Sequence, residues 1–158
     1  MGDSLKVFDY VKKYLPLDVV KTLDNLNSSQ QQGITEIRIR RNMPVTFVID
    51  NRIKFADRFC QTLAVIPKEP LIISSQEFDD MFNRLCSYSV YSNMTNLKNG
   101  YLTLENGSRV GVCSTAVYED DDLVSVKDVT SVNIRIPRQA VGCSRDIIAK
   151  TFANGVCS

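Results

Sequence analysis

The sequence predicts an α+β fold, in which an amino-terminal helical hairpin precedes a mixed or antiparallel sheet packed with helices. Apolar residues near the amino terminus recur at helical spacing, and from Glu36 they alternate with polar residues as in a strand. The alternation returns between Gly100 and Pro137, on both sides of Asn106-Gly107, a strong signal for a hairpin turn. The chain has 158 residues, 44% hydrophobic and 23% charged, and is long enough to bury one core.

The helical hairpin is expected to occupy residues 1–32. Pro16 interrupts the first helical pattern, and a second one begins at Leu17. This second pattern fades in the polar stretch 27–32, just before Gly33. We expect the two helices to lie against a larger unit.

The larger α+β unit is expected to span residues 33–142. Three strands are predicted in its first part, at residues 36–40, 45–49 and 52–55. Asp50-Asn51 separates the second strand from the third and is suited to a two-residue turn.

Two helices are predicted in the middle of this unit, after a short strand at 71–73. Ser74 and Glu77 have the spacing of a capping box, and an apolar helical stripe follows them. A second short helix at 87–99 would be ended by Gly100.

The last part of the unit is expected to be a β-hairpin region. Residues 119–122 are all acidic and are expected at a hairpin tip, and Pro137 closes the last strand, 129–136. Residues 143–158 are expected to form a linker helix.

Composition excludes several classes of function. The 19 basic and 18 acidic side chains give a net charge of +1, which argues against nucleic acid as a partner. The chain has no histidine, and its five cysteines form no C-x-x-C pair, so we expect no metal site. We expect the cysteines to be reduced thiols, as in a cytosolic protein. No stretch approaches the roughly 20 apolar residues that span a bilayer, so no direct membrane insertion is expected.

Arginines are the candidate binding residues. One group consists of Arg38, Arg40 and Arg41. Because alternate strand positions share a face, this group could form a surface that binds an anion or a partner, or it could simply be a solvent-exposed charged face of the sheet. A second group lies on or next to late strands, where the guanidinium fork suits phosphate: Arg109, Arg135 and Arg138.

Two other groups of side chains have competing interpretations. The acidic residues 119–122 lack the alternating ligands and glycine of a calcium loop, which favours a solvated tip. Tyr88, Tyr91 and Tyr101 could stack on bases, but helical spacing favours a place in the core.

The seven glycines form neither G-x-x-x-x-G-K-[ST] nor G-x-G-x-x-G. Because histidine is also missing, we expect no catalytic residue and no cofactor for this chain alone.

A series of short motifs resembles the stage III sporulation protein AA family. The resemblance covers nearly the whole chain. No single motif is diagnostic of the family, and the resemblance rests on the order and spacing of the motifs together. The motifs are Glu36-Ile-Arg-Ile-Arg, Tyr88-Ser-Val-Tyr91, Gly100-Tyr-Leu-Thr103, Gly107-Ser-Arg-Val-Gly111 and Asn133-Ile-Arg-Ile136.

The resemblance implies a mother-cell ATPase of endospore formers, related to the ATPases of type II and type IV secretion and of pilus retraction. It implies a homo-oligomer, expected to be a hexamer, that uses ATP and Mg²⁺ and serves the membrane proteins of the mother cell–forespore channel. The expected location is the cytoplasm of the mother cell. Peripheral attachment to the membrane that faces the forespore is an open alternative. The ATPase core would begin beyond the 144–154 helix, so this chain resembles the amino-terminal domain alone.

In related secretion ATPases, as the resemblance implies, this domain covers the nucleotide and contributes arginines to its phosphates. Arg109 and Arg135, together with Arg138, are the matching candidates. Two alternatives stay open: a nucleic-acid-binding module that uses the arginine-bearing sheet, and a structural adaptor that docks a membrane-channel partner through residues 1–32.

Overall fold

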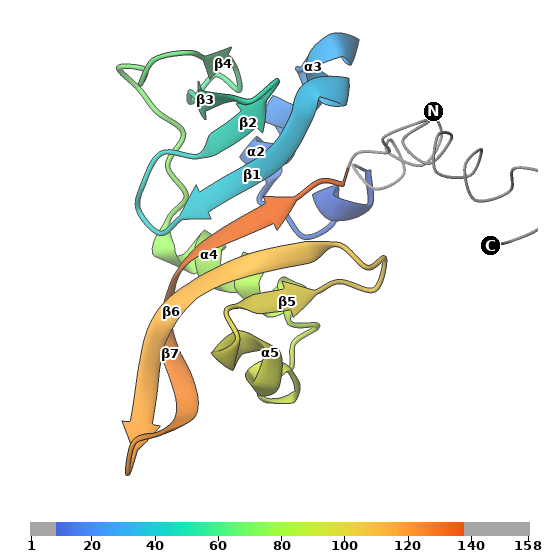
Figure 1. The fold of residues 1–158 in the computed structure, drawn as a ribbon. Helices are drawn as coiled ribbons and strands as arrows, with labels where there is room; N and C mark the ends of the chain where they lie inside the picture. The colour runs from blue at the N-terminus through green and yellow to red at the C-terminus, as the bar shows by residue number, and fades with distance from the viewer. Residues whose placement is uncertain (1–8, 138–158) are drawn as a thin grey trace, which may run out of the picture.

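A seven-stranded antiparallel sheet forms the body of the protein (Figure 1). The computed structural model describes residues 9–137. The strand order is β4-β3-β2-β1-β7-β6-β5, and each neighbouring pair runs antiparallel, which confirms the predicted α+β class. The elements are α2 (Leu17–Asp24), α3 (Ser28–Gly33), β1 (Ile34–Arg40), β2 (Thr46–Ile49), β3 (Arg52–Ala56), β4 (Thr62–Leu63), α4 (Ser75–Leu85), the 3₁₀ turn η1 (Tyr91–Asn93), α5 (Met94–Lys98), β5 (Tyr101–Thr103), β6 (Arg109–Glu119) and β7 (Asp122–Arg135).

From residue 9 onward, the described amino-terminal part of the chain holds one helix more than the sequence indicated. Residues 9–12 are helical and α2 begins at Leu17. The apolar helical pattern fades in the polar stretch 27–32, yet a further helix, α3, lies there. Asn27 and Gln30 cap α3 reciprocally: each side chain accepts a hydrogen bond from the other's backbone N–H, at 2.9 and 3.1 Å. This local capping compensates for the missing apolar stripe.

The predicted turns are confirmed by backbone geometry. Asp50 and Asn51 have φ of 50° and 59°, as the tight hairpin between β2 and β3 requires. Asp120 and Asp121, with φ of 46° and 66°, form the turn at the tip of the long β6–β7 hairpin. Gly107, with φ of +80°, lies in the loop between β5 and β6.

The helix predicted at 87–99 is shorter in the structure. Ser87 and Tyr88 have φ of 50° and 58°, so the chain turns sharply away from the axis of α4. Helical structure resumes only in η1 and α5, and Gly100 follows with φ of +78°. The apolar spacing indicated a helix but gave no sign of this reversal.

The short strand predicted at 71–73 is replaced by isolated bridges. Ile72 bridges to Pro44 and Pro70 to Asp57. The edge strand is instead β4, which pairs with β3. Proline has no backbone N–H to donate a ladder hydrogen bond, so Pro44 and Pro70 limit the strand pairing at this place to single bridges.

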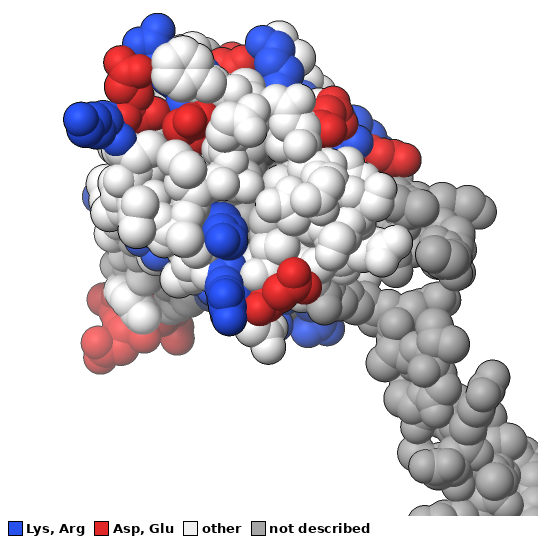
Figure 2. Space-filling model, turned by 90° about the horizontal axis from the view of Figure 1, so that it is seen from above, with Lys and Arg blue, Asp and Glu red and all other residues white. Residues whose placement is uncertain are grey.

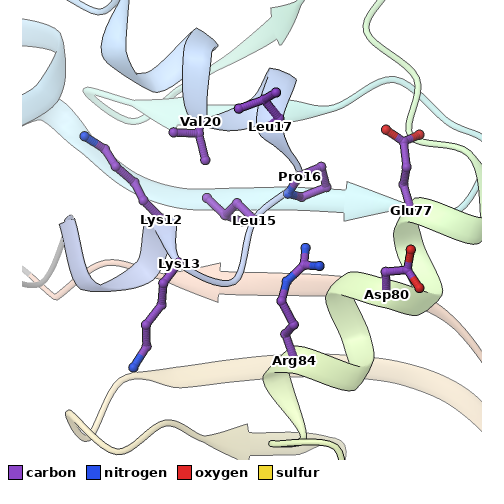
Figure 3. A pocket seen from close by; sticks show the side chains of 9 residues that line it. All are labelled: Lys12, Lys13, Leu15, Pro16, Leu17, Val20, Glu77, Asp80 and Arg84. Carbon is purple, nitrogen blue, oxygen red and sulfur yellow. The ribbon is translucent and has the colours of Figure 1, made fainter.

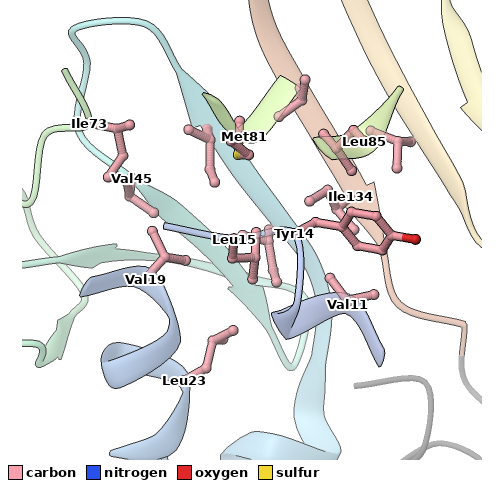
Figure 4. Packing of buried hydrophobic residues seen from close by; sticks show 14 of the residues in the cluster. Val11, Tyr14, Leu15, Val19, Leu23, Val45, Ile73, Met81, Leu85 and Ile134 are labelled. Carbon is pink, nitrogen blue, oxygen red and sulfur yellow. The ribbon is translucent and has the colours of Figure 1, made fainter. Parts of the chain in front are cut away.

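Helices and sheet share one hydrophobic core (Figure 4). Val19 and Leu23 of α2 and Met81 of α4 pack in the same buried cluster as Phe47 and Ile134 of the sheet. Because side chains alternate along a strand, the residues between these buried positions point to the opposite face of the sheet.

Two of the three described cysteines are small core residues. Cys60 and Cys86 are buried, and burial raises the pKa of the Cys86 thiol to about 11. Cys113 is exposed on β6.

Candidate anion-binding site

The face of the sheet opposite the core carries two cross-strand rows, which are apolar at β3 and β4 and polar or charged at β1 and β7. One row crosses all seven strands in the order Leu63, Phe55, Thr46, Arg38, Asn133, Gly111 and Tyr101. A second row runs beside it through Ile53, Val48, Glu36 and Arg135. Arg109 is next to that row, because the neighbouring position pairs Val110 with Ile134.

Arg109 and Arg135 meet at a hollow, which we call the arginine hollow. It has a volume of about 530 Å³ and lies where β1, β6 and β7 come together beside the β5–β6 loop. Its lining includes Thr35, Glu36, Ser108, Arg109, Arg135 and Ile136. Segments about 100 residues apart in the sequence thus form one concave surface.

Glu36 is the negative centre of this surface. Its carboxylate accepts hydrogen bonds from Nε and Nη2 of Arg38 at 2.8 and 2.6 Å and from Nδ2 of Asn133 at 3.3 Å. Nε of Arg135 lies 4.0 Å away. Burial disfavours the charged form of Glu36, but the hydrogen bonds and the two nearby arginines outweigh burial and lower its pKa.

Arg109 brings a charge that no carboxylate balances among the described residues. Its guanidinium carbon lies 5.4 Å from the centre of the Tyr101 ring, in cation–π contact. The side chain of Arg135 is 72% exposed, so both guanidinium groups can reach an incoming anion. One glutamate and three arginines (Arg38, Arg109 and Arg135) leave a local positive excess suited to phosphate.

We expect Glu36→Gln to lower the free energy of unfolding at pH 7 by about 1–2 kcal/mol, because it removes a charged acceptor shared by two arginines. The folded-state pKa of Glu36 is lowered, so its contribution is present above the unfolded pKa of about 4.3 and is lost as the pH falls. The difference between wild type and variant should therefore shrink below about pH 4. Urea denaturation between pH 3 and pH 7 measures it, with Glu69→Gln, at an exposed ion pair, as the control.

The first arginine group is divided among three environments. Arg38 is held by Glu36, and Arg40 is exposed at the end of β1. Arg41 is engaged with Asp79 of α4 at 2.6 and 3.1 Å and also donates to the backbone oxygens of Ser75 and Val129. Arg41 therefore ties α4 to the sheet, and an anion or partner surface built on this group stays a prediction.

The remaining predicted residues are placed as follows. Arg138 lies outside the described residues. Tyr88 and Tyr91, predicted in the core, are instead 79% and 89% exposed, because the reversal after α4 turns them outward. The acidic residues 119–122 form a hairpin tip, and the described residues contain no group of three or more potential metal ligands.

Glu36 is the site residue that the sequence interpretation missed. Its signal was present: in Glu36-Ile-Arg the carboxylate and the guanidinium of Arg38 are two residues apart in a strand, so they share a face. The pairing of β1 with β7, which adds Arg135, had no local signal.

A second hollow, of about 520 Å³, lies between residues 12–20 and α4 (Figure 3). Its charged side chains already have partners: Lys12 pairs with Asp9 and Asp24, and Arg84 donates to the backbone oxygen of Tyr14. Among the described residues, Arg109 of the arginine hollow has neither a carboxylate nor a backbone oxygen as a partner, so the arginine hollow is the stronger anion site.

The charge distribution agrees with a local site rather than an extended basic surface. Figure 2 shows basic and acidic residues interspersed with uncharged ones across one end of the molecule. In the described part of the chain, no helix has the length and apolar character needed to cross a membrane.

Comparisons with known proteins agree with the sequence motifs. The family described as sporulation stage III, protein AA, matches residues 8–158. A curated protein of Bacillus subtilis (strain 168), stage III sporulation protein AA, is 26% identical over 148 residues, which are 91% of this chain and 43% of that protein. This chain thus spans less than half the length of that relative.

A solved structure, the VirB11 ATPase from the Brucella suis type IV secretion system in complex with sulphate, aligns with 99% of this chain and 39% of its own. The TM-score is 0.45 and the sequence identity 13%.

Proposed function

The chain belongs to the stage III sporulation protein AA family, and from this premise we propose that it is the non-catalytic assembly and regulatory domain of a sporulation ATPase. In this proposal the ATPase core lies in a longer protein that serves the mother cell–forespore channel. The intact protein would be a homo-oligomer, most simply a hexamer, in the cytoplasm of the mother cell.

The observation that carries the proposal is the arginine hollow. Arg109 and Arg135 come from neighbouring strands to one concave surface, and Arg109 has no carboxylate partner among the described residues. Paired guanidinium groups bind phosphate oxygens through bidentate hydrogen bonds. They would stabilise the charge that develops on the γ-phosphate of ATP held by the core, where closure excludes water.

In this proposal the phosphates are the part of ATP that contacts the arginine hollow. Arg109 and Arg135 would hold phosphate oxygens, and Glu36 would keep Arg135 and Arg38 in place beside them. The described residues supply no cluster of metal ligands, so Mg²⁺ would be held by the phosphates and by residues of the core.

The test compares three proteins. The first is the product of the longest reading frame that contains this chain, the second is the isolated chain, and the third is the first protein without residues 1–137. We expect ATP turnover and assembly only in the first. Turnover by the isolated chain at the rate of the longer protein would refute a non-catalytic role, and unchanged assembly after the deletion would refute an assembly role.

The exposure of Tyr88 and Tyr91 favours one second candidate, binding of single-stranded nucleic acid by base stacking. A salt-sensitive gel shift of RNA by the isolated chain, lost in a Tyr88→Ala/Tyr91→Ala variant, would support this candidate over the first.

A further inference from the structure

The long β6–β7 hairpin leaves part of one strand without a neighbour. β5 pairs with β6 only from Arg109 to Gly111, and the N–H of Val112 donates to the backbone oxygen of Gly100 at 2.8 Å. Beyond that point the hairpin projects from the body of the protein, as Figure 1 shows. Among the described residues, no strand pairs with the side of residues 113–118 that faces away from β7. We call this stretch of β6 the free edge.

The free edge lacks most of the features by which natural edge strands avoid pairing. Such strands are short, or they carry proline or charged side chains, above all lysine. The free edge has the sequence Cys-Ser-Thr-Ala-Val-Tyr, with no charge and no proline, and its Tyr118 is 63% exposed. Register shifts against β7 near Ser114 and before Tyr118 flank a regular stretch at 115–117. The unpaired N–H and C=O groups of such a stretch are a template for another strand.

The other edges of the described sheet are protected. Where β7 extends beyond its pairing with β1, the backbone N–H of Arg41 donates to the oxygen of Thr130 at 2.9 Å, and its guanidinium donates to the oxygen of Val129 at 3.3 and 3.2 Å. Lys127 and Asp128, the latter with φ of 49°, follow on the same strand. The outermost strands, β4 and β5, have only two and three residues. The free edge is therefore the exception.

The two ends of the free edge carry opposite charges. The hairpin tip, residues 119–122, has four acidic side chains, and none of them has a basic partner in the described part of the chain. At the other end lies Lys98, in the last turn of α5 and two residues before Gly100; it too has no partner of opposite charge among the described residues. Antiparallel pairing of two free edges would place each tip beside Lys98 of the other copy. Parallel pairing would instead bring the two acidic tips together.

We propose that the free edge binds the free edge of a second copy of this chain, antiparallel and about a two-fold axis. With the regular stretch 115–117 at the centre, Ala116 would lie on the axis, and Thr115 would face Val117 of the other copy. Backbone hydrogen bonds would supply the affinity, and no like charges would oppose one another between residues 113 and 118. A second copy presents a strand that is already formed, so pairing costs less ordering entropy than with a disordered peptide. The proposal does not depend on the ATPase function.

The first test is sedimentation equilibrium of the intact chain. We expect a weak, concentration-dependent dimer, because contact along one short strand is smaller than a standard interface. Thr115→Lys/Val117→Lys should weaken dimerisation about tenfold, since each lysine would face a lysine of the other copy. The matched control Gln32→Lys/Gln61→Lys adds the same charge at exposed positions outside the hairpin and should dimerise like wild type.

A second variant leaves the paired strand unchanged. Asp120→Asn/Asp121→Asn removes two charges of the tip, and asparagine tolerates the positive φ of this turn. Dimerisation should weaken about threefold and become less sensitive to salt, because the attraction to Lys98 is reduced. Circular dichroism checks that each variant is folded.

Amide hydrogen exchange at low and high protein concentration locates the contact. Amides of residues 113–118 should exchange more slowly at high concentration, whereas those of the exposed residues 63–66 should not change. The proposal is overturned if wild type stays monomeric at every concentration, if the lysine variant is folded and dimerises like wild type, or if the protection appears on another surface. Should the lysine variant fail to fold, the tip variant and the exchange measurement decide.

Discussion

Replacing Arg109 and Arg135 together with alanine is expected to lower ATP turnover of the full-length protein about 1,000-fold, without loss of assembly. Arginines that reach a transferring phosphoryl group contribute about 10³–10⁵ to kcat. Both side chains lie at one hollow and are exposed, so their removal should leave the fold intact. Steady-state turnover and size-exclusion chromatography measure the two effects.

Two controls make this result specific. Arg109→Lys keeps the charge but loses the planar fork, so it should recover only part of the activity. Arg58→Ala removes an exposed arginine that is paired with Glu69, and its turnover should match wild type. Unchanged turnover in the double alanine variant would refute a role of the arginine hollow in nucleotide chemistry.

Phe47→Ala should cost about 3–5 kcal/mol of the free energy of unfolding, because it leaves a cavity in the core. Phe47 is fully buried on β2 and belongs to the core that the sheet shares with α2 and α4. A loss of this size approaches the total stability of many domains. Urea denaturation of the isolated chain measures it.

Phe59→Ala is the matched control, since the same side chain is removed from an exposed position. Its cost should stay within about 0.5 kcal/mol. Equal costs for the two variants would mean that β2 does not pack in the core as described.

Local signals predicted much of the fold. The capping box of Ser74 and Glu77 marked the start of α4, and Asp50-Asn51 marked the β2–β3 turn. These features depend on residues within a few positions of one another, so the sequence alone specifies them. The reversal at Ser87 and Tyr88 escaped prediction because neither residue favours positive φ.

The candidate site was only partly predictable. The sequence predicted that Arg109 and Arg135 lie on or next to late strands, and the structure shows both exposed, on β6 and β7. Their meeting with Glu36 depends on the pairing of β1 with β7, which no local pattern encodes. The long-range pairing of β1 with β7 therefore determines how Glu36, Arg109 and Arg135 meet, which the local motifs do not specify.

That central pairing also constrains how the protein folds. Glu36 pairs with Arg135, so the middle of the sheet joins the first strand to the last. Closing so long a loop costs entropy before the contacts form, and chains rich in such distant contacts fold slowly. During synthesis β1 must wait, with one edge unpaired, until residue 135 has left the ribosome, and this interval is when the nascent chain is most exposed to misassembly.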